Sequence, residues 1–231
     1  MEAARLRCRA LWLLPLLLLC WPAGVQAQDA ATRRTLLLKV TPQYVVVSGY
    51  WLEVEKSWNQ HPNQSFVFTP QVYAGPAGQP NASKPSIEPE RTVRGAGLQV
   101  QHRWYLSATQ AAYSSGVYVS YGPHFQHFAV SYEGQGWEQV EGPNGLPYLE
   151  YRSGRHTESI NRYGGTVQMG YQAPLHPGRV FLDLYAGIGW RASTSRDGSV
   201  ALTSQYRSGT SDYGHEGFYF PAGVKIGVAL R

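Results

Sequence analysis

Cysteine is almost absent from this chain of 231 residues. Its two cysteines, Cys8 and Cys20, both lie within the first twenty residues, in a segment with the features of an export signal. Removing the first 27 of the 231 residues leaves 204 residues that contain no cysteine. A disulfide scaffold, a cysteine nucleophile and a cysteine-ligated zinc or iron–sulfur site are therefore excluded from the mature protein.

Charged residues are also scarce, at 15% of the chain. No apolar run in the mature chain approaches the roughly 20 residues of a membrane-spanning helix. The chain therefore matches neither a disordered acidic protein nor a polytopic helical membrane protein. The excess of 20 Lys and Arg over 15 Asp and Glu is small and spread along the sequence, so a nucleic-acid-binding surface is not expected.

The first 27 residues have the layout of a signal peptide. Three arginines among the first nine residues precede an apolar run over residues 10–20. Val25 and Ala27 then supply the small side chains that signal peptidase prefers, which predicts cleavage before Gln28. We therefore predict a signal peptide over 1–27, an N-terminal extension over 28–34 and one folded domain over 35–231.

Two other roles for this segment stay open. A signal anchor would need an apolar run of roughly 20 residues, and the run here is about half that length. Lipid attachment at Cys20 would place the bulky Leu19 where lipidation sites usually carry a small residue.

In the mature chain, apolar and polar residues alternate with a period of two, and no helical periodicity extends beyond a turn or two. Such alternation indicates β-strands with one apolar face. Within one of these runs the apolar face changes parity after Phe125, which predicts a β-bulge near Gln126. Eight segments show the alternation, at about residues 36–41, 50–55, 66–73, 98–106, 117–132, 162–171, 180–191 and 218–231.

The connections between these segments alternate in length. Long ones, rich in Gly, Ser, Pro and Asn, are expected at about 76–94, 132–158 and 193–217, and short ones at about 58–63, 107–114 and 173–178. Only the first connection, about 42–44, is short where the alternation requires a long one. The pattern predicts an all-β fold, an eight-stranded antiparallel up-and-down transmembrane β-barrel with short periplasmic turns and long extracellular loops.

Alternation alone does not decide whether the apolar faces meet lipid or a second sheet, as in a soluble secreted β-protein. Several runs reach about ten residues, which is the length that a tilted strand needs to cross a bilayer. The opposite faces combine charge with glycine, as a narrow lumen requires. Aromatic residues also lie near the expected strand ends, as in an interfacial girdle, namely Trp58, Trp104, Tyr105, Tyr171, Trp190, Phe218 and Tyr219.

The export signal, the eight strands, the alternating loops and the glycine–aromatic run from Leu184 to Trp190 together resemble the small outer-membrane β-barrels of Gram-negative bacteria, most of all barrels common in the Bacteroidetes. The resemblance implies a location in the outer membrane and contact with outer-membrane lipid and lipopolysaccharide. It also implies insertion by the barrel-assembly machinery. The chain departs from this family at Arg231, where such barrels often end in an aromatic residue.

The polar faces of the strands supply the candidate interior residues. Because an eight-stranded barrel is just wide enough for side chains to fill, its buried charges must pair. We predict a structural network of ion pairs there, with a proton relay or a small-ion site as the alternative. Its members are Lys39, Glu53, Glu55, Arg103, His124, Arg162, Asp183 and Lys225, and the same faces carry Gln71, Gln99, Gln101, Gln168 and Arg191.

No catalytic, cofactor-binding or metal site is expected. His124 and His127 are three residues apart, which places them on opposite faces of a regular strand. The sequence therefore predicts a monomeric, non-catalytic barrel with a structural role or with a surface-recognition role carried by the long loops, which are rich in Tyr and Trp. The alternatives are a lipid-modifying enzyme that uses His156 and Ser159, or His124, a narrow pore, and a soluble secreted β-protein.

Overall fold

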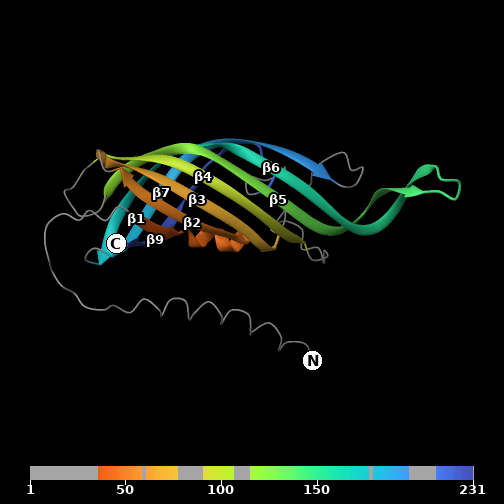
Figure 1. Ribbon diagram of the computed structural model, residues 1–231, viewed down its shortest axis with the longest axis horizontal. Coiled ribbons are helices and arrows are strands. Elements are labelled where there is room, and N and C mark those ends of the chain that lie inside the picture. Colours follow the sequence, from red (N-terminus) through yellow and green to blue (C-terminus); the bar gives the residue numbers. More distant parts are fainter. Residues whose placement is uncertain are drawn as a thin grey trace, which may run out of the picture. The chain divides into compact units, whose positions relative to one another are not determined.

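The computed structural model describes residues 36–58, 61–77, 91–106, 115–176, 179–197 and 212–230 (Figure 1). The predicted signal peptide and N-terminal extension lie outside the described residues. Within these ranges no helix is long and apolar enough to cross a membrane. The elements are β1 (Leu36–Val40), the 3₁₀-helix η2 (Pro42–Val47), β2 (Gly49–Trp58), β3 (His61–Pro76), β4 (Thr92–Tyr105), β5 (Gly116–Glu141), β6 (Pro147–His176), β7 (Val180–Asp197), β8 (Gly217–Tyr219) and β9 (Ala222–Leu230).

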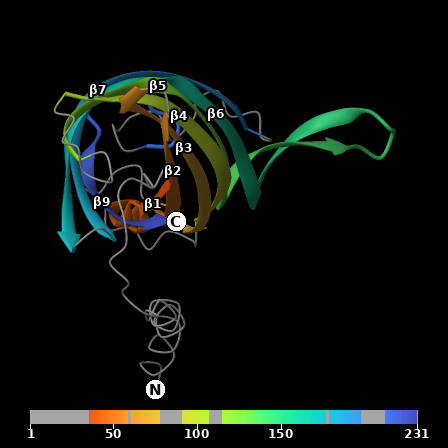
Figure 2. The ribbon, with the colours of Figure 1, turned by 60° about the vertical axis from the view of Figure 1, so that its left-hand side comes forward.

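The strands close into a ring (Figure 2). From β1 to β7 each strand pairs antiparallel with the next, and β9 pairs with both β7 and β1. The short β8 continues β9 along β7 in the same register, with a break at Phe220 and Pro221. Because β8 and β9 form one interrupted strand, the ring has eight strands, and the predicted eight-stranded antiparallel barrel is confirmed.

The register around the ring fixes the stagger of the barrel. Leu230 pairs with Leu36, and stepping from partner to partner through β2 to β7 ends at Ile188. The register of β7 with β8 and β9 places Ile188 opposite Phe220. The path therefore returns to the strand on which it began ten residues away from Leu230, and this offset of ten residues is the stagger of the barrel. A staggered eight-stranded barrel has strands that tilt by about 35–45° and an interior that side chains can fill.

The outer surface of the barrel is apolar. Along β9, Val224, Ile226 and Val228 face outward and are 37–46% exposed, whereas Lys225 between them is buried. Among the predicted girdle residues, Trp58, Trp104, Tyr171, Trp190 and Phe218 are exposed on this surface. Soluble proteins rarely expose so continuous an apolar band, and acyl chains of a membrane would cover it.

Two predicted girdle residues point inward instead. Tyr105 is buried in the lumen, and Tyr219 lines an interior cavity. Both residues alternate in step with the polar residues of their strands, and successive residues of a strand point to opposite faces, so both side chains point inward.

The predicted bulge near Gln126 is wrong. β5 keeps one register with β4 from Tyr118 to Ser131, so the inward face continues through Gln126 to Phe128 and Val130. The apolar residues that suggested a change of parity pack inside the barrel. There they form an interior cluster, which we call the apolar layer, made of Tyr73, Val93, Phe128, Val130, Ile160 and Tyr213.

The predicted loop 132–158 is also wrong, because β5 and β6 continue through most of it. They pair with each other as far as Glu141 and Pro147, and residues 142–146 form the turn. Beyond Ser131 β5 no longer pairs with β4, and before Glu158 β6 does not pair with β7. This two-stranded hairpin arm, residues 132–157, extends past the end of the barrel (Figures 1 and 2).

The connection from β1 to β2 spans residues 41–48 rather than 42–44, and it contains η2. β1 has only five residues, and its pairing with β9 ends at Val40 and Ile226. Beyond Val40, η2 occupies the position between β2 and β9 that a longer β1 would have filled in the wall of the barrel. Gln43 of η2 points inward and donates a hydrogen bond from Nε2 to the Tyr185 hydroxyl at 3.1 Å.

Candidate functional site in the barrel lumen

The described interior of the barrel is arranged in successive layers along its axis. On β5, for example, the inward residues run from Tyr118 to His124 and then to Phe128. Nearest Leu36 and Leu230 is a small apolar cluster of Leu37 and Phe181, then come an ionic layer and a cavity, and the apolar layer lies at the opposite end. The ionic layer consists of Lys39, Glu53, Glu55, Arg103, Asp183 and Lys225.

Arg103 contacts all three carboxylates of the ionic layer. Its Nη1 lies 2.7 Å from Glu55 Oε2 and 3.1 Å from Asp183 Oδ2, and its Nη2 lies 3.1 Å from Glu53 Oε1. The guanidinium also lies over the ring of Tyr118, 4.0 Å from the ring centroid. Arginine suits this place because its planar fork can hold several carboxylates at once.

The two lysines complete the neutralisation. Lys39 Nζ lies 2.6 Å from Glu55 Oε2, 2.9 Å from Asp183 Oδ2 and 3.2 Å from Glu53 Oε1. Lys225 Nζ pairs with the other oxygen of Glu53. Three cations thus face three carboxylates, and the charges of the layer balance.

Neutral side chains satisfy the remaining oxygens of the ionic layer. Ser65 and Tyr105 donate hydrogen bonds to Glu55 Oε1 at 2.7 and 2.6 Å, and Tyr118 donates one to Asp183 Oδ1 at 2.5 Å. Buried ions cost several kcal/mol each unless they are both paired and hydrogen-bonded, as these are. None of these donors was predicted from the sequence, although Tyr105 shares the inward parity of Arg103 and could have been identified from it.

Glycine makes room for the long side chains. A Cβ built on Gly227 would lie 2.5 Å from Cγ of Lys39, and one built on Gly170 would overlap the hydroxyl end of Tyr118. Both glycines therefore stand where any larger residue would displace a member or a donor of the ionic layer. Glycine on the polar faces, which the sequence suggested as a sign of a narrow lumen, has this packing role here.

The other two predicted network residues, His124 and Arg162, lie in the cavity and not in the ionic layer. Arg162 donates hydrogen bonds from Nε to Gln126 Oε1 at 2.7 Å and from Nη1 to the backbone oxygen of Asp212 at 3.0 Å. Its guanidinium also lies 4.9 Å from the centroid of the Phe128 ring. The predicted set of eight residues therefore separates into six that form ion pairs with one another and two that line the cavity.

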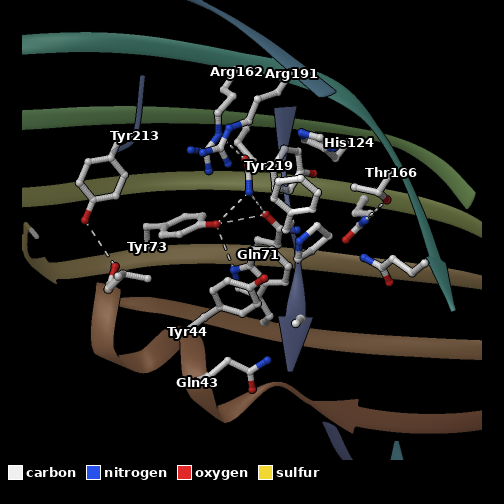
Figure 3. Close-up of a pocket in the computed structure, with 18 of the residues that line it drawn as sticks. Gln43, Tyr44, Gln71, Tyr73, His124, Arg162, Thr166, Arg191, Tyr213 and Tyr219 are labelled. Carbon is white, nitrogen blue, oxygen red and sulfur yellow. Dashed lines mark hydrogen bonds between the residues drawn. The ribbon is translucent and has the colours of Figure 1, made fainter. Parts of the chain in front are cut away.

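The cavity has a volume of about 640 Å³. Arg162, Arg191 and His124 reach it from β6, β7 and β5, and Arg191 lies 4.4 Å from the centroid of the Tyr219 ring (Figure 3). Tyr44 and Trp51 stack beside it with their centroids 3.7 Å apart. In the described part of the chain, the residues that line this cavity include no aspartate or glutamate.

The sequence candidates for catalysis are not brought together. His156 is buried on the inward face of β6, and Ser159, three residues further along a regular strand, belongs to the opposite face. The pair therefore cannot work as a nucleophile and its base. His124 and His127 are likewise on opposite faces, and the described ranges contain no group of three metal-ligating side chains.

A closed ring of strands, an apolar exterior and a polar, filled interior define a transmembrane β-barrel. No family model matches the chain, and no curated protein matches it. Among solved structures it is similar to CarO of Acinetobacter baumannii, with 9% identity and a TM-score of 0.39 over 88% of this chain and 100% of that chain. So low a score carries no argument, and the fold is assigned from the strand pairing and the two faces.

Proposed function

We propose that this chain is a monomeric, non-catalytic outer-membrane barrel that does not conduct ions and that presents its hairpin arm and long loops at the cell surface for recognition. In this proposal the short turns and the barrel end that carries Leu36 and Leu230 face the periplasm. The outer surface contacts membrane lipid and lipopolysaccharide, and the ionic layer is a structural plug.

The observation that carries the proposal is the ionic layer. Its six charged residues are each at most 5% exposed and are joined by ion pairs across the lumen. Arg103 from β4, Glu53 from β2 and Asp183 from β7 meet near the barrel axis, so this layer leaves no room for hydrated ions to pass. A pore is therefore the less favoured function.

The hairpin arm supports a recognition role. Trp137 and Tyr151 pack against each other across it, with ring centroids 5.3 Å apart, and both are more than half exposed. Rigid aromatic side chains on a protruding element are common features of binding surfaces.

The orientation can be tested with single cysteines, because the mature chain has none of its own. Asn144→Cys lies in the turn of the hairpin arm, and Arg179→Cys lies in the short turn between β6 and β7. A membrane-impermeant maleimide added to intact cells should label the first variant and not the second. Labelling of Arg179→Cys alone would reverse the orientation.

Planar-bilayer recording tests the closed lumen. The purified barrel should insert without measurable conductance, and gel mobility that changes on heating would show that the inserted protein is folded. Steady ion currents from folded barrels would overturn the proposed plug. Recovery of the processed chain in the periplasm without detergent would overturn the membrane location.

A further inference from the structure

The wall of the barrel is interrupted beside the cavity. β1 ends at Val40, so the part of β9 that precedes Ile226 and the whole of β8 do not pair with it. η2 stands opposite this edge, and both sides line the cavity, η2 through Val46 and the interrupted strand through Phe218, Phe220 and Ala222. We call this opening the side portal.

The mouth of the side portal is strongly apolar. Val46 is 88% exposed, Phe220 is 77% exposed and Phe218 is 66% exposed, although all three also line the cavity. They lie at the loop end of the apolar belt that continues along β9 to Leu230. The portal therefore opens toward the acyl chains of one leaflet rather than toward water.

The other two exits are filled. The ionic layer lies at one end of the cavity along the barrel axis, and Tyr213 of the apolar layer lies at the other end, with its ring 5.0 Å from that of Phe128 and its hydroxyl 3.4 Å from the backbone oxygen of Val47 (Figure 3). Among the described residues, the exposed members of the cavity lining lie at the side portal, and we take this as the route between the cavity and its surroundings.

The chemistry inside the cavity differs from that of its mouth. Arg162 and Arg191 bring two positive charges, and the described lining brings no carboxylate. In the described lining of the cavity, Gln71 Nε2, His124 Nδ1 and Gln168 Oε1 are buried without a hydrogen-bond partner. Buried polar atoms usually have partners, so the two nitrogens are available to an anionic group and the Gln168 oxygen to a donor such as a hydroxyl. Guanidinium groups with additional N–H donors are the usual receptors for carboxylates and phosphates.

We propose that the cavity binds an anionic amphiphile, an acyl chain with a carboxylate or phosphate headgroup, which enters sideways from the membrane through the side portal. The headgroup contacts Arg162 and Arg191, and the chain lies against Val46, Phe218 and Phe220. A volume of about 640 Å³ is within the range of small-molecule sites. This binding goes beyond surface recognition and does not require it, although it does require the barrel to lie in a membrane.

Equilibrium binding to the purified barrel in dodecyl maltoside micelles tests the headgroup. The probes are radiolabelled dodecanoate and dodecyl phosphate, with dodecanol as the uncharged analogue and inorganic phosphate as the headgroup without a chain. We expect saturable, one-to-one binding of both anionic probes and none of dodecanol. Equal binding of dodecanol would overturn the charged site. Inorganic phosphate that binds as tightly as dodecyl phosphate would overturn the amphiphile and leave a site for free anions.

Charge variants assign the site within the barrel. Arg162→Gln with Arg191→Gln should weaken binding of dodecyl phosphate by about ten- to a hundredfold, the effect of losing charged hydrogen bonds. The corresponding double lysine variant should retain most of the affinity, because it keeps both charges. Arg94→Gln, an exposed arginine on β4, is the matched control and should change nothing. Unchanged affinity in the double glutamine variant would overturn the proposal.

Entry through the side portal has its own test, which leaves the lumen charges intact. Val46→Trp should slow the association of dodecanoate severalfold because it narrows the mouth. Val45→Trp is the matched control, since Val45 is exposed on the same helix and does not line the cavity. Equal association rates in the two variants would overturn lateral entry.

Discussion

At the residue scale, the ionic layer depends most on Arg103, which contacts three carboxylates and one aromatic ring. Arg103→Met would leave Glu53, Glu55 and Asp183 facing two lysines, with one buried negative charge uncompensated. Removing one partner from a buried ion pair typically costs about 3–5 kcal/mol. We expect a loss of that size in the free energy of unfolding, measured by denaturant titration of the barrel in lipid vesicles.

A compensating variant separates charge from packing. Glu55→Gln added to Arg103→Met restores electrical balance and should recover part of the lost stability. Arg94→Met on the outward face of the same strand should change the free energy of unfolding by no more than about 0.5 kcal/mol. Equal effects of Arg103→Met and Arg94→Met would show that the ionic layer does not stabilise the barrel.

Gly227 is a second residue whose size is fixed by the lumen. The Cβ that Gly227→Leu introduces would lie only 2.5 Å from Cγ of Lys39, so Lys39 must move away from its carboxylates. Overpacking of this kind typically costs about 1–3 kcal/mol. The free energy of unfolding should fall by at least that much, whereas Val228→Leu, on the lipid-facing side of the same strand, should leave it nearly unchanged.

The alternation of residues along each strand allowed the inward or outward direction of single side chains to be predicted. The thirteen polar residues that the sequence placed on inward faces, from Lys39 to Lys225, are all buried. Which of them meet could not be read from the sequence, because the stagger of ten residues around the ring decides that His124 and Arg162 lie in the cavity and not in the ionic layer. Tyr105 was predicted on the girdle because tyrosine suits both an interface and a lumen.

At the element scale, the hairpin arm is built separately from the barrel. Its strands pair with each other and with no neighbouring strand among the described residues. Replacing residues 134–154 with Asn-Gly, a turn that suits a two-residue hairpin, would join Glu133 directly to its partner Arg155. We expect the shortened chain to insert, to keep its heat-modifiable gel mobility and to melt within a few degrees of the full chain. Failure to insert would show that the arm is needed for the barrel to fold.

The same separateness explains why the arm was not predicted. A barrel strand has one face toward lipid and one toward the lumen, so its residues alternate in polarity. Most side chains of the arm are exposed on both faces, as Leu149 and Glu150 are, and no alternation marks its strands. η2 was not predicted for a related reason. It is a single 3₁₀ segment in the wall, with Gln43 directed inward and Val45 outward, and so short a helix leaves no periodic pattern.

At the scale of the whole molecule, the lumen is blocked twice in series. The ionic layer and the apolar layer are separated by the cavity, and each is built from residues of several strands. Two barriers in series predict that opening either one alone leaves the barrel closed to ions. This arrangement is also the reason why we place the entry of the proposed amphiphile at the side of the barrel and not along its axis.

Conductance of layer variants tests this arrangement. Arg103→Ala with Tyr105→Ala should open the ionic layer, and Phe128→Ala with Tyr213→Ala should open the apolar layer. Neither double variant should conduct in planar bilayers, whereas the combination of all four substitutions should, provided that its gel mobility still changes on heating. Conductance from the first pair alone would mean that the apolar layer is permeable to ions. Conductance from the second pair alone would mean that the ionic layer is permeable to ions. The first outcome would leave the ionic layer as the only plug, and the second would leave the apolar layer as the only plug.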